Sequence, residues 1–431
     1  MAATITTADK ILKLLYTQRD LENAVYEKNP LFALIPKSGG FEGRSIVHAL
    51  TYGNSLARSA AFGTAQGRAG INGVSGTDTG FNRDVNFTVS RVKNYAMATI
   101  EQELALAAKG KNQGAFVKAA TQLIDGTLQT LRNDFGRDIY GSGLGELGQI
   151  SAVSGSTATT TFTVGEAITQ IEVGMQIVVS NGSTKTAAIR TPNSNGFVPV
   201  LSVNRAAGTF VADNQAVSGA VGLGAVAGDW IFLAGDRPAI STTAVSSMLK
   251  IAGMDAWNPV TTPSSSENFW GVDRSIDATR LAGQRLDISA LQPEEGYITA
   301  LAALAREDGD PSHIFASFTD EKNLKLALGS RVDSEYTAVG DIGFESIHLR
   351  GPNGIVKVYA DRNAPVGYAR ILTLNTWELK HLGDLVNKGD ALGDGGMARE
   401  YQADRYECRF SFYGNLLCYK PAANMVATLP T

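Results

Sequence analysis

Hydrophobic residues recur at helical spacing over one long stretch in the first third of the chain. Between residues 98 and 140 they fall every three or four positions, as at Ile100, Phe116, Leu128 and Ile139. This spacing places them along one face of a helix. Four glycines interrupt the stretch, and each costs about 1 kcal/mol relative to alanine in a helix interior. The pattern therefore predicts a long helix that depends on packing along its apolar face, with a break near Gly110.

The residues before this helix predict a short helical arm and a long hairpin. Apolar positions over 7–25 fit one face of a short helix. Residues 43–53 and 84–98 read as strands, and the residues between them are rich in Gly, Ala, Ser and Thr. A two-stranded hairpin buries little apolar surface for the entropy that it loses, so it needs another surface to lie on. We expect a neighbouring copy of the chain to supply that surface.

The pattern changes twice after the long helix. Residues 149–235 carry few charges and repeat short Val- and Thr-rich runs at about ten-residue intervals, which is typical of a small all-β barrel or sandwich. The rest of the chain alternates between helical and extended patterns, which indicates an α+β fold. Helices are expected over 246–257, 293–308 and 318–329, and extended segments over 269–289, 313–318, 344–351, 354–361, 367–375 and 406–429.

Composition and charge exclude several classes of protein. The chain has 431 residues, of which 44% are hydrophobic and 19% charged, so it can bury a large core. It contains no run of eighteen apolar residues and no basic segment followed by an apolar one at the N-terminus. We therefore expect no membrane span, no secretory signal and a cytoplasm-like compartment. The net charge of −4 argues against sequence-specific reading of nucleic acid, but leaves room for loose contact through local basic patches.

No pattern of residues indicates catalysis, a metal or a cofactor. The sequence GLGELG at 143–148 matches a dinucleotide-binding motif literally, but it follows a helix and leads into a strand, which is the reverse of the required order. Two cysteines ten residues apart are expected to be buried apolar residues rather than a bridge or a ligand pair. Four histidines lie too far apart for a metal site. These residues are Cys408, Cys418, His48, His313, His348 and His381.

The order of these parts resembles the major capsid (coat) proteins of tailed double-stranded DNA bacteriophages. The residues that carry the resemblance are the hairpin at 38–67 and 84–103, the helix end LRNDFGRDIYG at 131–141, and the segments 269–287, 356–383 and 406–429. The resemblance implies the α+β fold of those proteins, with an N-terminal arm, an extended hairpin loop, a long spine helix, an axial domain and an inserted β-domain. It also implies a structural function, with pentamers and hexamers closing into an icosahedral shell around packaged DNA, in a virion assembled in the host cytoplasm.

Carried onto this sequence, the resemblance divides the chain into seven segments. They are an arm at 1–37, the hairpin loop at 38–97, the spine helix at 98–148, the insert at 149–236, a peripheral segment at 237–289, the axial domain at 290–390 and a return to the peripheral domain at 391–431.

This sequence departs from the family in two ways, which change what is expected of shell crosslinking and of the scaffolding protein. Some relatives crosslink their shells through a lysine on the hairpin loop, but residues 38–92 contain no lysine, so that crosslink is not expected here. Only 37 residues precede the loop, which favours a separate scaffolding protein. The resemblance also implies a portal protein at one vertex, a decoration protein as a further partner and loose contact with DNA. The residues proposed for contact between subunits are the arginines of the loop, Arg44, Arg58, Arg68, Arg83 and Arg91.

Two alternatives stay open at this point. An encapsulin-like compartment would share the fold but enclose enzymes instead of DNA, and such shells usually have shorter chains without a β insert. A cell-surface or tail-fibre adhesin would account for the β-rich insert, but would require trimeric fibres. An enzyme is disfavoured because no catalytic constellation was found.

Overall fold

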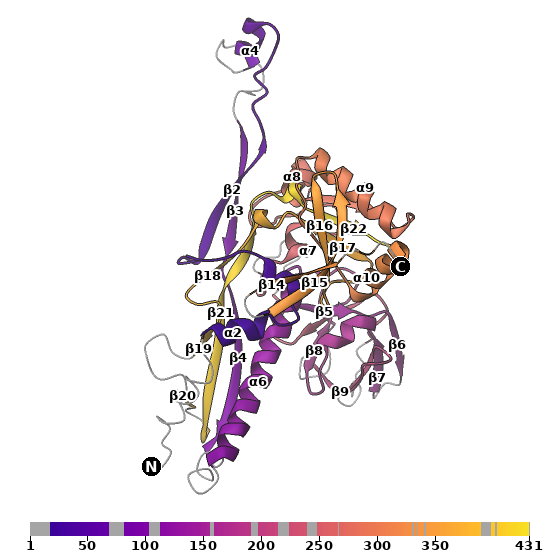
Figure 1. Ribbon diagram of the computed structural model, residues 1–431. Coiled ribbons are helices and arrows are strands. Elements are labelled where there is room, and N and C mark those ends of the chain that lie inside the picture. The colour runs from indigo at the N-terminus through magenta and orange to yellow at the C-terminus, as the bar shows by residue number, and fades with distance from the viewer. Residues whose placement is uncertain are drawn as a thin grey trace.

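The computed structural model describes residues 18–68, 82–102, 113–155, 159–190, 197–213, 224–238, 248–265, 267–329, 332, 334–339, 342–388, 398–400 and 403–430. The molecule is elongated (Figure 1). A thin hairpin projects from one end, a long strand pair and a long helix extend toward the other, and two further bodies lie beside them.

One long strand organises the central sheet. β21 (Arg405–Cys418) pairs antiparallel with four other strands, and β1 (Lys37–Gly39) extends the sheet by pairing parallel with one of them. Those four are β4 (Val92–Glu101), β18 (Trp377–His381), β19 (Asn387–Lys388) and β20 (Ala398–Arg399). The sheet thus joins segments from both ends of the chain, and both cysteines lie buried and unbridged on β21, as predicted.

The long helix α6 (Gln113–Asp138) packs against this sheet along its apolar face. Ile124, Leu128, Leu131 and Phe135 are buried at helical spacing. Such side chains each contribute about 1.5–3 kcal/mol when fully buried. The ring of Phe135 stacks on Phe32 at 5.1 Å and meets Phe412 edge-on at 5.0 Å, so the helix is held between the arm and the sheet. The arm forms helices α2 (Gln18–Tyr26) and α3 (Pro30–Leu34).

The side chains of Asn29 and Asn363 approach helix α6 so closely that only a glycine fits at position 136. A Cβ at Gly136 would collide with the side-chain amides of Asn29 and Asn363. Asn29 is itself buried, donates to the carbonyl of Arg132 at 2.8 Å and accepts from Asn363 at 2.9 Å. The glycine therefore lets the arm and the loop after β16 meet on the helix surface.

The prediction of a single helix over 98–140 is wrong at its start. Residues 98–101 belong to β4, in which Ala98 and Ile100 are buried and the residues between them are exposed. Ile100 also fits the helical spacing of Leu104 and Ala107, so the apolar pattern assigned it to the helix, although the alternation of Ala98 and Ile100 is typical of a strand. The predicted break at Gly110 lies outside the described residues. The strand predicted over 84–98 is also divided at Arg91, into β3 of the hairpin and β4 of the central sheet.

A second, seven-stranded sheet carries two of the predicted helices. Its order is β12-β22-β17-β13-β16-β15-β14, and α9 (Pro293–Arg306) and α10 (Phe318–Leu328) pack against it. The strands are β12 (Gln284–Asp287), β13 (His313–Ala316), β14 (Ser334–Val339), β15 (Ile342–Gly351), β16 (Gly354–Ala360), β17 (Tyr368–Leu372) and β22 (Met425–Thr428). The strands predicted at 313–318, 344–351, 354–361 and 367–375 and the helices at 293–308 and 318–329 are confirmed within a few residues.

Three expectations for this part of the chain need correction. Of the described closing segment, β20 and β21 belong to the central sheet, whereas β22 pairs with β12 and β17 of the seven-stranded sheet. The extended segment expected over 269–289 contains η2 (Arg274–Asp277) and α8 (Ala278–Ala282), which Asp273 and Asp277 cap. The helix expected over 246–257 is reduced to α7 (Met254–Trp257) within its described part. Short η4 (Leu374–Thr376) and η5 (Pro421–Ala423) complete the connections.

The insert is a small barrel. The strand order is β5-β11-β8-β9-β10-β7-β6. β5 and β6 stand at the two ends of this order, but only Ile150 and Ser151 separate them in the chain, so the two ends of the sheet lie close together and the sheet curves into a barrel. Phe162 and Phe210 stack at 5.1 Å in its core. The elements are β5 (Glu146–Gln149), β6 (Ala152–Gly155), β7 (Thr159–Thr163), η1 (Gly165–Gln170), β8 (Gln176–Val179), β9 (Val198–Asn204), β10 (Thr209–Asp213) and β11 (Trp230–Leu233). The all-β prediction is confirmed.

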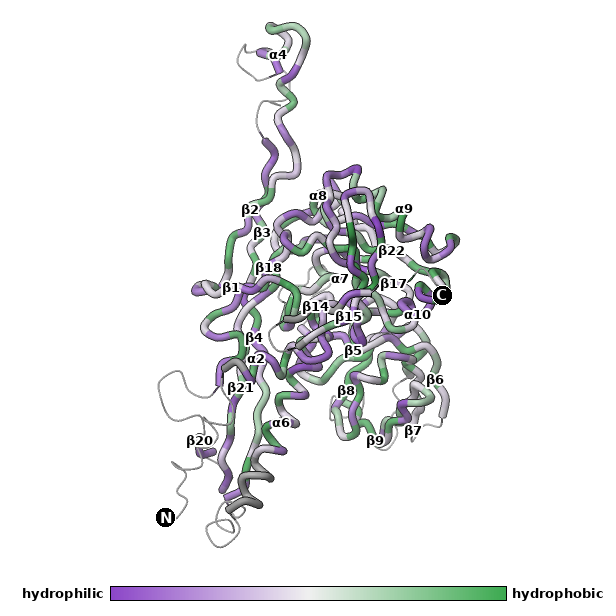
Figure 2. The backbone as a smooth tube through the Cα atoms, in the orientation of Figure 1, coloured by the Kyte–Doolittle hydropathy of each residue, from purple (hydrophilic) through white to green (hydrophobic). Residues whose placement is uncertain are grey.

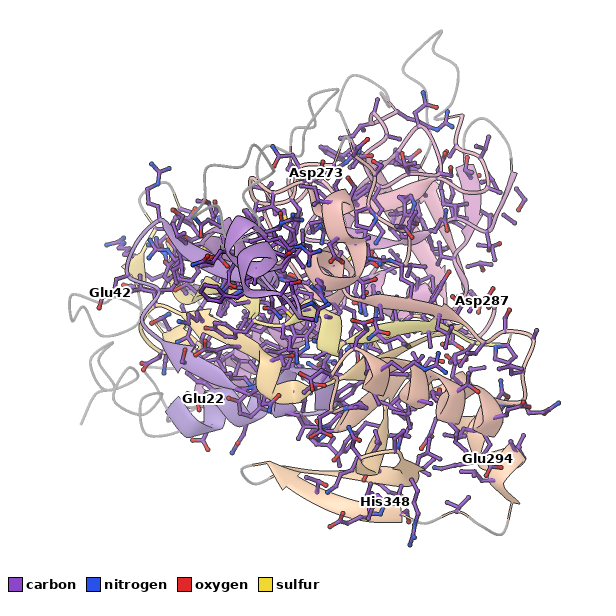
Figure 3. The ribbon with its side chains drawn as sticks, turned by 90° about the horizontal axis from the view of Figure 1, so that it is seen from above. Glu22, Glu42, Asp273, Asp287, Glu294 and His348 are labelled. Carbon is purple, nitrogen blue, oxygen red and sulfur yellow. The ribbon has the colours of Figure 1, made fainter. Side chains whose placement is uncertain are left out.

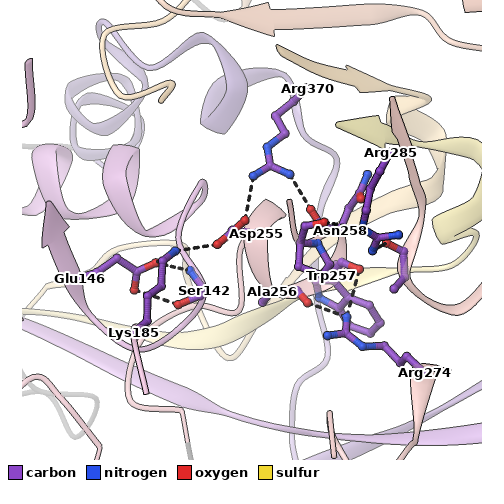
Figure 4. Close-up of polar contacts among 12 residues, drawn as sticks. Ser142, Glu146, Lys185, Asp255, Ala256, Trp257, Asn258, Arg274, Arg285 and Arg370 are labelled. Carbon is purple, nitrogen blue, oxygen red and sulfur yellow. Dashed lines mark hydrogen bonds and ion pairs between the residues drawn. The ribbon is translucent and has the colours of Figure 1, made fainter. Parts of the chain in front are cut away.

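A chain of ion pairs joins the barrel to the rest of the molecule (Figure 4). Lys185 of the barrel binds Glu146 at 2.8 Å and Asp255 at 2.6 Å, and Asp255 also binds Arg370 of β17 at 3.1 Å. Burial alone would raise the pKa of Asp255, but the charges of Lys185 and Arg370 outweigh it and hold that pKa well below its ordinary value. This ionised state stabilises the fold above about pH 4, and the contribution is lost as the pH falls toward the lowered pKa.

We predict that Lys185→Met lowers the free energy of unfolding by about 3–5 kcal/mol, because it leaves Glu146 and Asp255 close together without the shared cation. Urea unfolding monitored by tryptophan fluorescence measures the loss. The control is Glu172→Gln, which removes an ion pair to Arg205 whose side chains are 57% and 49% exposed and should cost under about 1 kcal/mol. Equal losses in the two variants would show that the buried network does not stabilise the junction.

Candidate functional site

The search for a site begins with clusters of side chains that could bind a metal ion. No group of three His, Cys, Asp or Glu side chains in the described ranges could hold a metal ion. Viewed from above, Glu42, Asp273, Asp287 and Glu294 lie apart from one another (Figure 3). Of the helices that the structure describes, none is long and apolar enough to cross a membrane. The most distinctive feature of the described surface is the projecting hairpin (Figure 1).

The hairpin consists of two strands and a short helix at its tip. β2 (Ser45–Gly53) and β3 (Arg83–Ser90) pair only with each other, and α4 (Phe62–Arg68) lies beyond them, far from the body of the molecule (Figure 1). An isolated hairpin of this kind is marginally stable at best in water. Its base therefore has to be held by the body, and its tip has no described part of its own chain to lie on.

Four side chains anchor the base of the hairpin. His48 and Leu50 of β2 and Phe87 and Val89 of β3 are buried, while the alternate residues face solvent. The ring of Phe87 lies 5.3 Å from Trp257 of α7 and 6.1 Å from Phe269, so it fills an aromatic pocket of the body.

Hydrogen bonds supplement these anchors. The backbone N–H of Thr88 donates to the carbonyl of Trp270 at 3.0 Å, and Arg280 donates to the carbonyl of Tyr52 at 2.7 Å. Trp270 has a positive φ of 53°, which costs a bulky L-residue roughly 1–2 kcal/mol. The turn that receives the hairpin is thus held in an unfavourable backbone conformation by its surroundings.

The outer part of the hairpin exposes apolar side chains. Phe62 at the tip is 78% exposed and Leu56 is 47% exposed, and at the base Val47, on the solvent side of β2, is 64% exposed. Figure 2 shows hydrophobic and hydrophilic segments adjoining each other at this tip. The tip packs against no other part of the chain that the structure describes, and exposed apolar side chains in such a position are suited to contact with another molecule.

The five predicted contact arginines occupy different parts of the hairpin. Arg58 and Arg68 lie at the tip, where Arg68 donates to the carbonyl of Arg58 at 2.6 Å, and Arg44 and Arg83 are exposed beside the strands. Arg91 instead donates to the carbonyl of Phe41 at 3.0 Å, which ties the root of the hairpin together. Their role in contact between subunits stays a prediction.

A second apolar surface lies between β4 and α6. Tyr95 and Met97 of β4 are 55% and 59% exposed, and Leu123 of α6 is 43% exposed. With neighbouring residues they line an open groove of about 610 Å³. The sequence analysis missed this groove because it placed the boundary between β4 and the helix too early. The four anchors were also missed, although the alternation of His48 and Leu50, and of Phe87 and Val89, was a signal that could have identified them.

We predict that Phe87→Ala releases the hairpin base and lowers the free energy of unfolding by about 3–5 kcal/mol, as large-to-small changes of buried aromatic residues do. Hydrogen exchange should show faster opening of residues 45–53. The matched control is Val47→Ala on the exposed face of the same hairpin, which should change stability by no more than about 0.5 kcal/mol. If both variants left residues 45–53 equally protected, Phe87 would not be an anchor.

The chain was compared with known proteins. Its sequence matches no protein-family model and no curated protein. Among solved structures, it is similar to the capsid asymmetric unit of cyanophage A-1(L), with a TM-score of 0.46 and 10% identity over 94% of this chain and 93% of that chain. It is similar to the capsid of a native GTA particle, with a TM-score of 0.40 and 8% identity over 96% and 91% of the two chains. It is also similar to the SrpI encapsulin of Synechococcus elongatus, with a TM-score of 0.41 and 8% identity over 93% and 86%.

Proposed function

We propose that this chain is a structural protein, the major capsid protein of a tailed double-stranded DNA bacteriophage, and that its copies form the pentamers and hexamers of an icosahedral shell. The observation that carries the proposal is the projecting hairpin, which exposes Phe62 and Val47 and is anchored only at its base. Such a projection completes its packing when a second copy lies beneath it.

Charge supports contact between copies. The described hairpin, residues 44–68 and 82–91, carries five arginines and a single aspartate, in a chain whose net charge is −4. A cationic projection is attracted to the more acidic body of another copy, and repeated attraction of this kind favours association. The proposed contact residues remain Arg44, Arg58, Arg68 and Arg83, whereas Arg91 serves the root of its own hairpin.

The projecting shape of the hairpin favours closed rings of subunits. An arm that reaches from one copy onto a different surface of the next makes a heterologous contact, and such contacts close into rings when the rotation between copies allows it. Each contact can then be weak, because every copy both gives and receives an arm and the closed ring holds all of them together.

The proposal extends to partners and location, on the strength of the resemblance in element order. It includes a separate scaffolding protein, a portal protein, a decoration protein on the outer surface, loose contact with packaged DNA, and assembly in the host cytoplasm. It includes no cofactor and no catalytic step. Because residues 38–92 contain no lysine, the shell would be held by noncovalent contacts at this loop.

An encapsulin-like compartment is the alternative, and the contents of the shell distinguish the two. Shells purified from infected or expressing cells would be treated with nuclease and then opened. Protected double-stranded DNA in shells made with the neighbouring phage genes supports the capsid, whereas enclosed protein cargo without DNA supports the compartment.

We predict that deleting residues 54–80 leaves a soluble subunit that forms no closed shells, because the strands and anchors of the base remain while the reaching part is lost. Negative-stain electron microscopy of the purified protein measures shell formation, and circular dichroism verifies the fold. Normal shells from the deletion variant would contradict the proposal.

We also predict that Phe62→Ser raises the protein concentration needed for shell formation without changing the midpoint of thermal unfolding, because the side chain is 78% exposed in the single chain. Light scattering during assembly measures the concentration threshold. Val173→Ser, at a 64% exposed position in the barrel, is the control and should leave the threshold unchanged. Equal thresholds for both variants and the parent would show that the tip does not contribute to contact.

A further inference from the structure

One of the four anchors at the hairpin base is a histidine, whose side chain becomes charged when it binds a second proton. His48 lies on β2 and is 7% exposed. Its Nε2 lies 3.1 Å from the backbone carbonyl oxygen of Cys418, at the end of β21. Because a carbonyl only accepts, the neutral ring donates from Nε2 and carries no proton on Nδ1. In the part of the chain that the structure describes, Nδ1 has no hydrogen-bond partner.

Aromatic rings from three elements surround this imidazole. The ring centroid of Tyr419 lies 4.8 Å away and edge-on, and those of Trp257 and Phe87 lie at 6.3 and 6.4 Å. A neutral imidazole packs well in these surroundings. A charged imidazolium would lose most of its hydration there and gain little in return.

The charged groups near the ring add to this cost. Lys380 of β18 is positively charged, and the nearby Glu378 is occupied by Ser38, Tyr419 and Lys380 itself. Arg280 of α8 approaches β2 from another side and donates to its backbone. None of the described carboxylates forms an ion pair with His48. Burial, and after it the charge of Lys380, hold the pKa of His48 below its ordinary value, against the hydrogen bond to Cys418, which would raise it.

We propose that His48 is a proton-sensitive anchor, whose protonation loosens the contact of β2 with the body and widens the range of positions that the hairpin can take at its base. The added proton comes from solvent and binds Nδ1, and no bond to carbon is made or broken. The released ring is hydrated and binds the proton more tightly than the anchored ring. The anchored state therefore loses stability as the pH falls below about 6.5, the ordinary pKa of histidine.

This inference concerns the single chain and does not rest on the proposed function. The other three anchors, Leu50, Phe87 and Val89, are apolar and keep their contacts at every pH, so the release is partial and reversible. Acidic surroundings would then change how freely the arm reaches a neighbour, without unfolding the body.

The test measures the position of the hairpin in the full chain as dilute subunits. Spin labels are placed on Leu56→Cys in the hairpin and Leu326→Cys on α10, which are 47% and 74% exposed. The native cysteines are buried and should not react. Distance distributions between the labels are compared at pH 7.5 and pH 5.0. Two other groups also have to be separated from His48, since burial raises the pKa of Asp361 to about 6 and lowers the pKa of Lys37 to about 7. The His48 variants keep both of these groups.

Four further substitutions, each made in the spin-labelled protein, test whether His48 causes the response to pH. We expect the labelled parent to show a broadened or shifted distance distribution at pH 5.0. His48→Phe and His48→Gln should lose that response, the second while keeping a donor for Cys418. His381→Gln and Asp361→Asn should retain it. The proposal is overturned if the parent shows no response, if both His48 variants respond as the parent does, or if Asp361→Asn alone abolishes the response.

Discussion

The anchoring of the hairpin base is the constraint on which the rest of the account depends. Two strands that pair with each other are held at their base by four buried side chains, and the described residues of the tip, 54–68, project away from the body. Because hairpins gain little from their own contacts, this arrangement leaves the outer part short of packing partners. The exposed Phe62 and the arginines of the tip make a second molecule of the same kind the natural source of those partners.

Long-range contacts hold the described parts of the body together. β21 pairs with strands from both ends of the chain, and α6 is held between that sheet and the arm through Phe135. Lys185 and Asp255 connect the barrel to the seven-stranded sheet. These long-range connections tie the described parts of the body to one another, whereas the hairpin is held to the body at the aromatic pocket around His48 and Phe87.

Sequence patterns predicted most of the helices and strands, but fewer of the contacts between them. The amphipathic faces of α6, α9 and α10 and the alternation in the barrel each appear in a local window, so they could be predicted. The strand at 98–101 was assigned to the helix, because Ile100 also fits the helical spacing of Leu104 and Ala107, whereas its alternation with Ala98 spans only three residues. The pairing of β22 with β17 depends on residues more than fifty positions apart, and the caps of α8 are ordinary aspartates in sequence. The anchors of the hairpin were visible as an alternation, but what they pack against was not.

Hydrogen exchange of the tip in free and associated subunits tests the central claim most directly. The account predicts that the amides of residues 54–62 exchange almost without protection in dilute subunits and become strongly protected when the subunits associate. Strong protection of those amides in dilute, monomeric protein, unchanged by association, would show that the hairpin is complete within one chain and would contradict the account.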